Sequence, residues 1–129
     1  MDDKTLKALL GAQQGELDAV LMYQKLAKKN KDPKIQELLL ETAKDEGRHA
    51  GVFHKITQVD LKPKSAQANL VSFIMSILGK KNTFKIISSF EYKAKDSYAP
   101  LVELFPEVES VAQDEFKHGD RMLEISKMF

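Results

Sequence analysis

Two segments of the chain repeat a set of residues that could bind a metal ion. Residues 43–49 read AKDEGRH and residues 112–118 read AQDEFKH, so both fit the pattern A-x-D-E-x-[KR]-H. On a helix, residues i and i+3 lie on one face about one turn apart, so a carboxylate and an imidazole at this spacing can reach one ion. The pairs with this spacing are Glu46 with His49 and Glu115 with His118.

A second element recurs upstream of each pair. Residues 16–23 and 91–98 both fit E-x-x-A-x-x-x-Y. Glu16 and Glu46 are equidistant from residue 31, and Glu91 and Glu115 are equidistant from residue 103. In an antiparallel helix hairpin, residues equidistant from the turn lie at the same level. Each hairpin is therefore predicted to bring two glutamates and one histidine together.

Four carboxylates in an apolar interior repel one another and cannot all stay ionised unless cations neutralise them. Two divalent ions would balance the four charges, and oxygen-plus-imidazole donors suit iron or manganese better than closed tetrahedral zinc. The donors therefore predict two metal ions, iron or manganese, with zinc as the less suitable substitute. The predicted bridging ligands are Glu46 and Glu115, the terminal ligands are Glu16 and Glu91, and His49 and His118 bind one ion each.

Residues next to the ligands are predicted to orient them. A metal-bound imidazole usually donates its second N–H to a carboxylate or carbonyl group. Asp45 and Asp114 are candidates for this, each for the histidine of the other hairpin. Tyr23 and Tyr98 could donate to the terminal glutamates, or could simply be buried with satisfied hydroxyl groups. His54 lies about 110° from the metal-facing side of its helix and is expected on the surface.

Apolar residues recur at helical spacing along almost the whole chain, and no strand is expected. Asp32 and Pro33 form an N-cap and first helical residue, Pro63 breaks the chain, Gly79 stops a helix, and Pro100 should bend another. The predicted helices are Asp2–Asn30, Pro33–Gln58, a short helix Gln67–Leu78, Thr83–Leu104 and Pro106 to the end. The connection runs from Val59 to Ala66. These elements predict an all-α four-helix bundle of two hairpins joined by a long connection with a short extra helix.

The amino-acid composition argues against several classes of function. A chain of 129 residues with 43% hydrophobic and 30% charged residues is expected to form a single domain over 1–129. A net charge of +1 with both signs interleaved argues against nucleic-acid binding. Without cysteine, disulfides, thiolate zinc sites and rubredoxin-type iron sites are excluded. The acidic N-terminus shows no targeting signal, so a cytoplasmic location is expected.

The most apolar segment is Leu70–Leu78, read LVSFIMSIL. It is about half as long as the roughly 20 residues that span a bilayer, so no transmembrane segment is expected. Its apolar side chains are expected to cover the bundle or to pack in a homodimer. The alternative is an interfacial membrane anchor, helped by Lys80 and Lys81.

The ligand pattern resembles that of the ferritin-like diiron-carboxylate proteins, in the rubrerythrin branch. Two helices of those proteins each give one glutamate and the other two each give Glu-x-x-His, as this sequence does over nearly its whole length. The chain is also similar to the ferritin-like domain found alone or fused to vacuolar-type iron transporters. That similarity lies in the apolar residues before the third long helix and in Tyr98, Phe105-Pro106-Glu107-Val108, Asp114-Glu115 and His118. The resemblance implies a non-haem diiron site that reacts with peroxide or dioxygen.

Three features depart from the family pattern. Rubrerythrins proper carry a cysteine-rich rubredoxin domain, so this chain would need an external electron donor, a rubredoxin-like protein or a flavin reductase. An additional carboxylate usually lies one turn from the third-helix ligand, where this chain has Ser88 and Ala94. The membrane portion of the transporters does not appear within the sequence.

The resemblance implies an oxidoreductase that reduces hydrogen peroxide at a diferrous centre, in peroxide defence. An alternative is a ferroxidase or iron-handling protein that oxidises Fe(II) with dioxygen. A third interpretation, from a different class, is a non-catalytic iron-binding accessory module for an iron transporter.

Overall fold

The computed structural model describes residues 1–129, which divide into two compact units, residues 1–69 and 70–129. Each unit is described by itself. Every regular element is helical, which confirms the all-α prediction, and no helix combines the length and apolarity needed to cross a bilayer. The elements are α1 (Asp3–Lys28), α2 (Pro33–Thr57), α3 (Ala66–Ser97), α4 (Ala99–Leu104), the 3₁₀ helix η1 (Pro106–Val108) and α5 (Glu109–Ser126).

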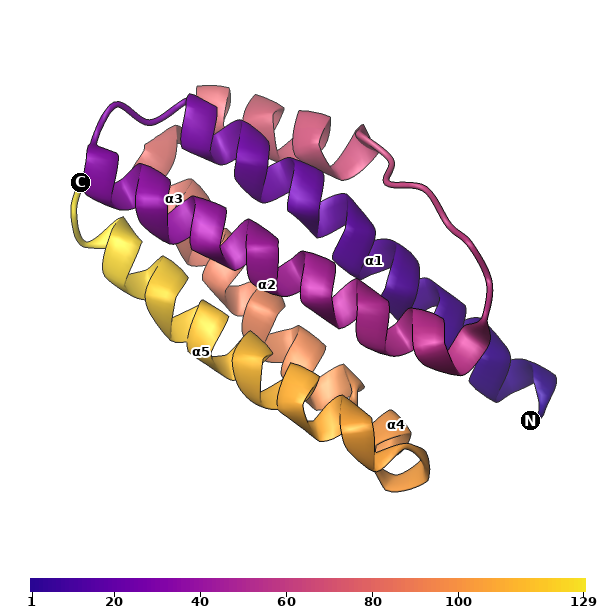
Figure 1. The fold of residues 1–129 in the computed structure, drawn as a ribbon. Helices are drawn as coiled ribbons and strands as arrows, with labels where there is room; N and C mark the ends of the chain where they lie inside the picture. The colour runs from indigo at the N-terminus through magenta and orange to yellow at the C-terminus, as the bar shows by residue number, and fades with distance from the viewer. The chain divides into compact units, whose positions relative to one another are not determined.

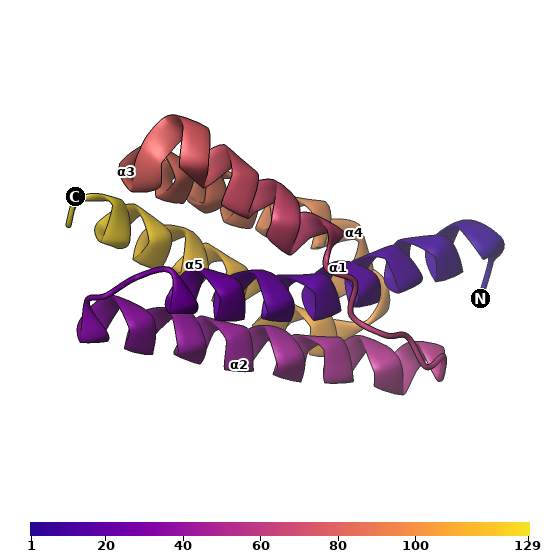
Figure 2. The ribbon, with the colours of Figure 1, turned by 90° about the horizontal axis from the view of Figure 1, so that it is seen from above.

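In the first unit, α1 and α2 form an antiparallel hairpin and lie side by side along their length (Figures 1 and 2). The turn has the predicted signals. The Asp32 side chain caps α2 by accepting a hydrogen bond from the Lys34 backbone N–H at 2.8 Å, and Pro33 occupies the first turn. The Asn30 side-chain amide donates a hydrogen bond to the Leu26 backbone carbonyl at 2.8 Å. This bond satisfies one of the carbonyl groups that have no partner within the helix at the end of α1.

The interior of this hairpin is built from large apolar side chains that recur at helical spacing. Leu9 and Leu26 of α1 are buried with Leu39 and Phe53 of α2. Burying a side chain of this size stabilises the fold by about 1.5–3 kcal/mol. These contacts hold the two helices in one register.

The connection after α2 is tied back onto α1. Gln58 ends the helix in the left-handed region, with φ 58°. The Thr57 hydroxyl donates to the Gln13 side chain at 2.6 Å, and the Gln13 amide donates to the Val59 carbonyl at 2.8 Å. The start of the predicted connection is therefore fixed to the hairpin by a buried glutamine.

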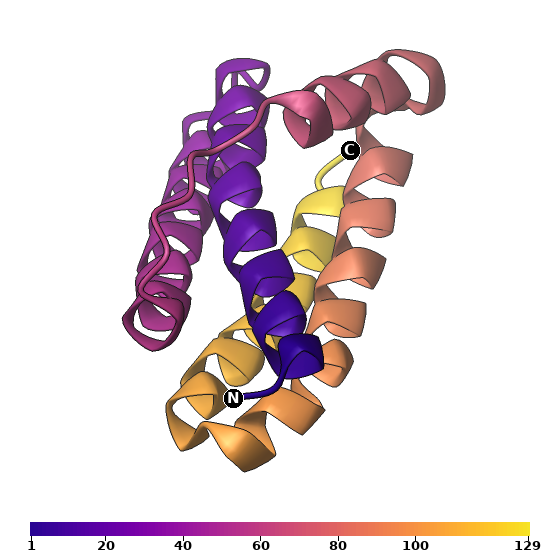
Figure 3. The ribbon, with the colours of Figure 1, turned by 90° about the vertical axis from the view of Figure 1, so that its right-hand side faces the viewer.

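In the second unit, α3 changes direction sharply (Figure 3), and the kink lies at Gly79. Gly79 has φ 81° and ψ 169°, a conformation that disfavours any residue with a Cβ. The predicted stop is confirmed, but only Gly79 is non-helical, and the helix resumes before the predicted Thr83. Lys80, Lys81 and Asn82 are compatible with a helix, so they continue it rather than forming a loop.

The later part of α3 packs antiparallel to α5 (Figure 1). The Ser88 hydroxyl donates to the Gly119 carbonyl at 2.6 Å, and the Tyr92 ring lies against Gly119 and 5.4 Å from the Phe116 ring. A Cβ at position 119 would lie 2.4 Å from the Tyr92 Cε1 atom. Glycine at this position therefore allows the two helices to come close together.

The predicted bend near Pro100 is present. The sequence pattern predicts one bent helix over Thr83–Leu104, and the structure has a break at Tyr98 between α3 and α4. Proline has no backbone N–H, so it cannot continue the hydrogen-bonding of α3. A new helix, α4, therefore begins after Tyr98.

Candidate metal centre

The first unit brings together one group of predicted ligands. Glu16 comes from α1, and Glu46 and His49 come from α2. The His49 Nδ1 atom lies 3.3 Å from Glu16 Oε2 and 3.3 Å from Glu46 Oε1. The three side chains are at most 2% exposed, and their donor atoms lie within 4.8 Å of one another. We call this group the first half-site.

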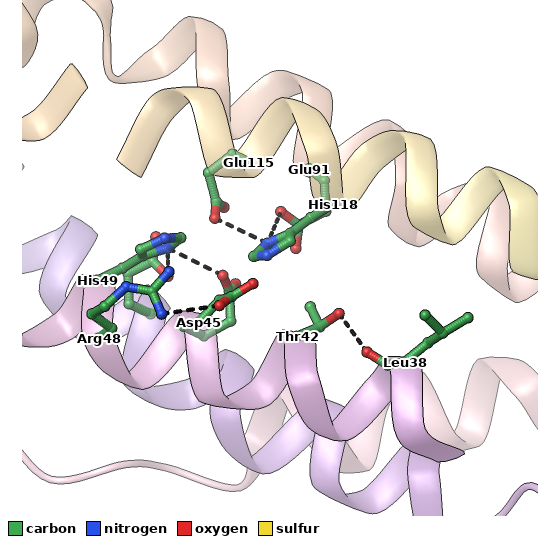
Figure 4. Close-up of polar contacts among 10 residues, drawn as sticks. Leu38, Thr42, Asp45, Arg48, His49, Glu91, Glu115 and His118 are labelled. Carbon is green, nitrogen blue, oxygen red and sulfur yellow. Dashed lines mark hydrogen bonds and ion pairs between the residues drawn. The ribbon is translucent and has the colours of Figure 1, made fainter. Parts of the chain in front are cut away.

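The second unit repeats the arrangement with Glu91 from α3 and Glu115 and His118 from α5. The His118 Nδ1 atom lies 3.7 Å from Glu91 Oε2 and 3.4 Å from Glu115 Oε1, contacts drawn in Figure 4. None of the three residues is more than 6% exposed. This group is the second half-site. In both hairpins, the glutamates predicted to face each other do so.

Burial raises the pKa of Glu91 to about 7, and the nearby Glu115 carboxylate also raises it, while the interaction with His118 opposes the shift. A carboxyl group with this pKa is still largely protonated below neutral pH, and nearby positive charge favours its ionised form. A divalent cation supplies that charge and binds the deprotonated forms of carboxylate and imidazole. The oxygen and nitrogen donors of the half-sites therefore fit a cation such as iron or manganese.

Small residues surround the ligands on the same helix faces. Ala43 precedes Glu46 by one turn, Ala112 precedes Glu115 by one turn, and Ala19 follows Glu16 by one turn, and all three alanines are buried. Side chains of this size leave room for the carboxylates to turn toward the histidines. The repeated alanines of the sequence motifs thus have a packing role.

The residues predicted to orient the ligands differ in their burial and in their hydrogen-bond partners. Asp45 accepts a hydrogen bond from Arg48 Nη1 at 3.0 Å within its own helix (Figure 4). Tyr23 and Tyr98 are buried, and Asp114 is half-buried. Their assigned roles toward the histidines and terminal glutamates stay predictions.

His54 belongs to the surface as expected. Its Nε2 atom lies 2.8 Å from Asp60 Oδ1, and the side chain is partly exposed. This imidazole lies outside both half-sites.

Two buried hydroxyl groups close to the ligands are not singled out by the sequence pattern as part of the site. Thr42 lies one turn before Glu46 and donates to the Leu38 carbonyl at 2.8 Å (Figure 4). Ser88 lies one turn before Glu91 and donates to Gly119, as described above. A search for polar residues three or four positions before each ligand would find both, because these positions share a helix face.

Two helix hairpins, each with a buried pair of glutamates and one histidine, define a ferritin-like carboxylate-histidine protein. The chain belongs to the rubrerythrin family, since the family model described as Rubrerythrin matches residues 7–126. This confirms the predicted ferritin-like all-α fold and the resemblance to ferritin-like diiron-carboxylate proteins.

The chain is also similar to curated cyanobacterial proteins. It is 30% identical over 126 residues to a magnesium-protoporphyrin IX monomethyl ester [oxidative] cyclase of Prochlorococcus marinus (strain MIT 9215), a match that covers 87% of this chain and 32% of that protein. The same-named protein of Synechococcus sp. (strain WH7803) is 27% identical over 119 residues, covering 81% of this chain and 33% of its own length. The chain thus spans about a third of the length of these relatives. No solved structure matches it.

Proposed function

We propose that the two half-sites together hold two iron ions in one dinuclear centre. Each half-site offers two carboxylates and one imidazole, which is one donor short of the four that a metal site commonly takes from protein. If Glu46 and Glu115 both bridge, each ion would gain a third carboxylate, which with its histidine makes four donor groups. The terminal ligands are then Glu16 and Glu91, and His49 and His118 complete the set.

The centre is proposed to reduce hydrogen peroxide in peroxide defence. When bound, two Fe(II) ions supply the two electrons that turn one hydrogen peroxide and two protons into two water molecules. The observation that carries this proposal is the burial of all six ligands, none of them more than 6% exposed. Such burial keeps bulk water and reactive oxygen products apart from the reacting groups.

The protein side chains hold and orient the metal donors. The Nδ1 atoms of His49 and His118 face the carboxylates of their own half-sites. Asp45 and Asp114 are proposed to accept the second N–H group of these rings and so to fix the ring orientation. Tyr23 is proposed to donate its hydroxyl to a terminal glutamate.

Electrons are proposed to reach the centre from outside these residues. The sequence has no cysteine, so no thiolate-held iron centre lies within these residues. A rubredoxin-like protein or a flavin reductase is the proposed donor, in the cytoplasm.

Oxidation of Fe(II) by dioxygen is a second candidate function. The name of the cyanobacterial relatives describes an oxidative reaction, which favours an oxidative role for the matching part of the chain. In this alternative, Fe(II) is the substrate and leaves as Fe(III).

An anaerobic Fe(II) titration followed by stopped-flow absorbance tests the proposal. We expect about two Fe(II) per chain and faster oxidation by hydrogen peroxide than by dioxygen. Preferential reaction with dioxygen and release of Fe(III) would favour the second candidate. Tight binding with no reaction toward either oxidant would indicate an iron-binding module without turnover.

A further inference from the structure

The helix that precedes Gly79 is apolar on two opposite sides. Ala68, Val71 and Met75 are buried on one side. The other side carries Leu70, Phe73 and Ile77, which are 58%, 62% and 65% exposed. Their i, i+3, i+7 spacing makes a single stripe, here called the outer face. A stripe of large apolar side chains on the surface marks an interaction site.

The charge around this helix has one sign. Between Asp60 and Glu91 the sequence contains no aspartate or glutamate, although the whole chain has a net charge of only +1. Lysine is the only charged residue type in this stretch, and Lys81 and Lys85 are exposed. The five lysines are Lys62 and Lys64 before the helix and Lys80, Lys81 and Lys85 after it.

We propose that the outer face binds the surface of a bilayer containing anionic phospholipids. Leu70, Phe73 and Ile77 would enter the boundary between headgroups and acyl chains, with the helix lying in the plane of the membrane. The flanking lysines would contact the phosphates, since long basic side chains can bury their methylene groups and keep the ammonium group at the headgroups.

The lysines around this helix favour an anionic lipid surface over a second copy of the chain as the partner of the outer face. In a symmetric pair, the outer faces would meet and the lysines at the ends of one helix would approach those of the other. Like charges brought together in this way repel, and no acidic residue in the stretch offsets them. An anionic bilayer can bury the apolar stripe and also pair its phosphates with the lysines at both ends of the helix.

Vesicle flotation tests this proposal with the whole chain. We expect the protein to float with vesicles of equimolar phosphatidylcholine and phosphatidylglycerol, less at high salt, and little with phosphatidylcholine alone. The double variant Phe73→Ser/Ile77→Ser should lower binding at least about tenfold. Lys80→Glu/Lys81→Glu should remove the preference for anionic vesicles. Leu40→Ser on α2, another exposed leucine, is the matched control and should bind as wild type. Circular dichroism verifies that each variant is folded.

A fluorescence probe locates the contact, because the chain has no tryptophan. The Phe73→Trp variant should shift its emission to shorter wavelength on anionic vesicles, whereas Leu104→Trp, at another exposed apolar position, should not. Absence of flotation, or a shift only in Leu104→Trp, would overturn the proposal. So would a lipid-free dimer in analytical ultracentrifugation that Phe73→Ser/Ile77→Ser dissociates, since a second copy would then cover the outer face.

Discussion

The His49 imidazole on α2 lies 3.3 Å from the Glu16 carboxylate on α1, thirty-three residues earlier in the chain. The distance joins the Nδ1 and Oε2 atoms of two side chains that are almost completely buried. The hairpin therefore brings three predicted metal donors together, with Glu46 as the third. Preassembly of this kind lowers the ordering cost of metal binding.

Removing a proposed bridging ligand should abolish dinuclear loading. In Glu46→Ala or Glu115→Ala, each ion loses a carboxylate, so we expect stoichiometry to fall from about two Fe(II) per chain to one or none. Anaerobic titration with elemental analysis measures this. Glu41→Ala, at an exposed glutamate of the same helix, is the control and should keep full loading. Retention of two ions in either bridging variant would refute the ligand assignment.

Removing one histidine should weaken one ion only. His49→Ala takes a terminal donor from the first half-site and leaves the second half-site complete. Titration with Co(II), followed by its visible absorbance, should show one site of near-wild-type affinity and one weakened by about 10-fold or more. Simultaneous loss of both ions would mean that the two sites are coupled more strongly than the proposed ligand map implies.

The metal-free protein should lose stability as pH rises toward neutrality. Glu91 has a pKa of about 7 in the folded chain, above its ordinary value of 4.5, so folding favours its protonated form. This contribution is fully present below the unfolded value and is lost as pH rises through the folded value, by up to about 3 kcal/mol. Urea unfolding of the metal-free protein at about pH 5 and about pH 8 measures it.

Glu91→Gln is the control for this pH dependence. Glutamine keeps the size of the side chain but does not titrate, so the difference between the two pH values should shrink. An unchanged difference would assign the pH dependence to other groups. Divalent metal added to wild-type protein at the higher pH should restore stability, because it binds the ionised carboxylates.

Substitution of Gly119 should destabilise the second unit. A Cβ there would lie 2.4 Å from the Tyr92 ring, so Gly119→Ala forces the ring or the helix to move. Overpacking of this kind costs about 1–3 kcal/mol and should appear as a lower midpoint of thermal unfolding. Gly51→Ala is the matched control, since nothing lies within 4 Å of the added carbon. It should be neutral or stabilising because alanine is the better helix former.

The hairpins and the clustering of the candidate ligands could be predicted because both follow from local patterns that occur twice. Glu46 and His49 are fixed by helical spacing, and their level relative to Glu16 follows from the position of the turn. The limited extent of the break at Gly79 could not be predicted. Lys80 and the residues after it are compatible with either a loop or a helix, and packing determines which one forms.

The contact between Tyr92 and Gly119 leaves no signal in the sequence either. It depends on how closely α3 and α5 approach, which side-chain packing along both helices determines. Thr42 is missed, and Ser88 is noted only as a departure from the family pattern, for a different reason. Their hydroxyl groups bond to backbone carbonyls, so they belong to no motif of acidic or imidazole residues.

The antiparallel register of α1 and α2 limits where the length of this chain can change. One residue inserted between Pro33 and Glu46 would rotate Glu46 and His49 by about 100° around the helix axis relative to the start of α2. The two ligands would then turn away from Glu16. Insertions between residues 60 and 65, which lie in the connection after α2, leave the ligand spacing of both hairpins unchanged. Natural or engineered variants that keep the predicted metal ligands should therefore differ in length at the connection and not within the paired helices.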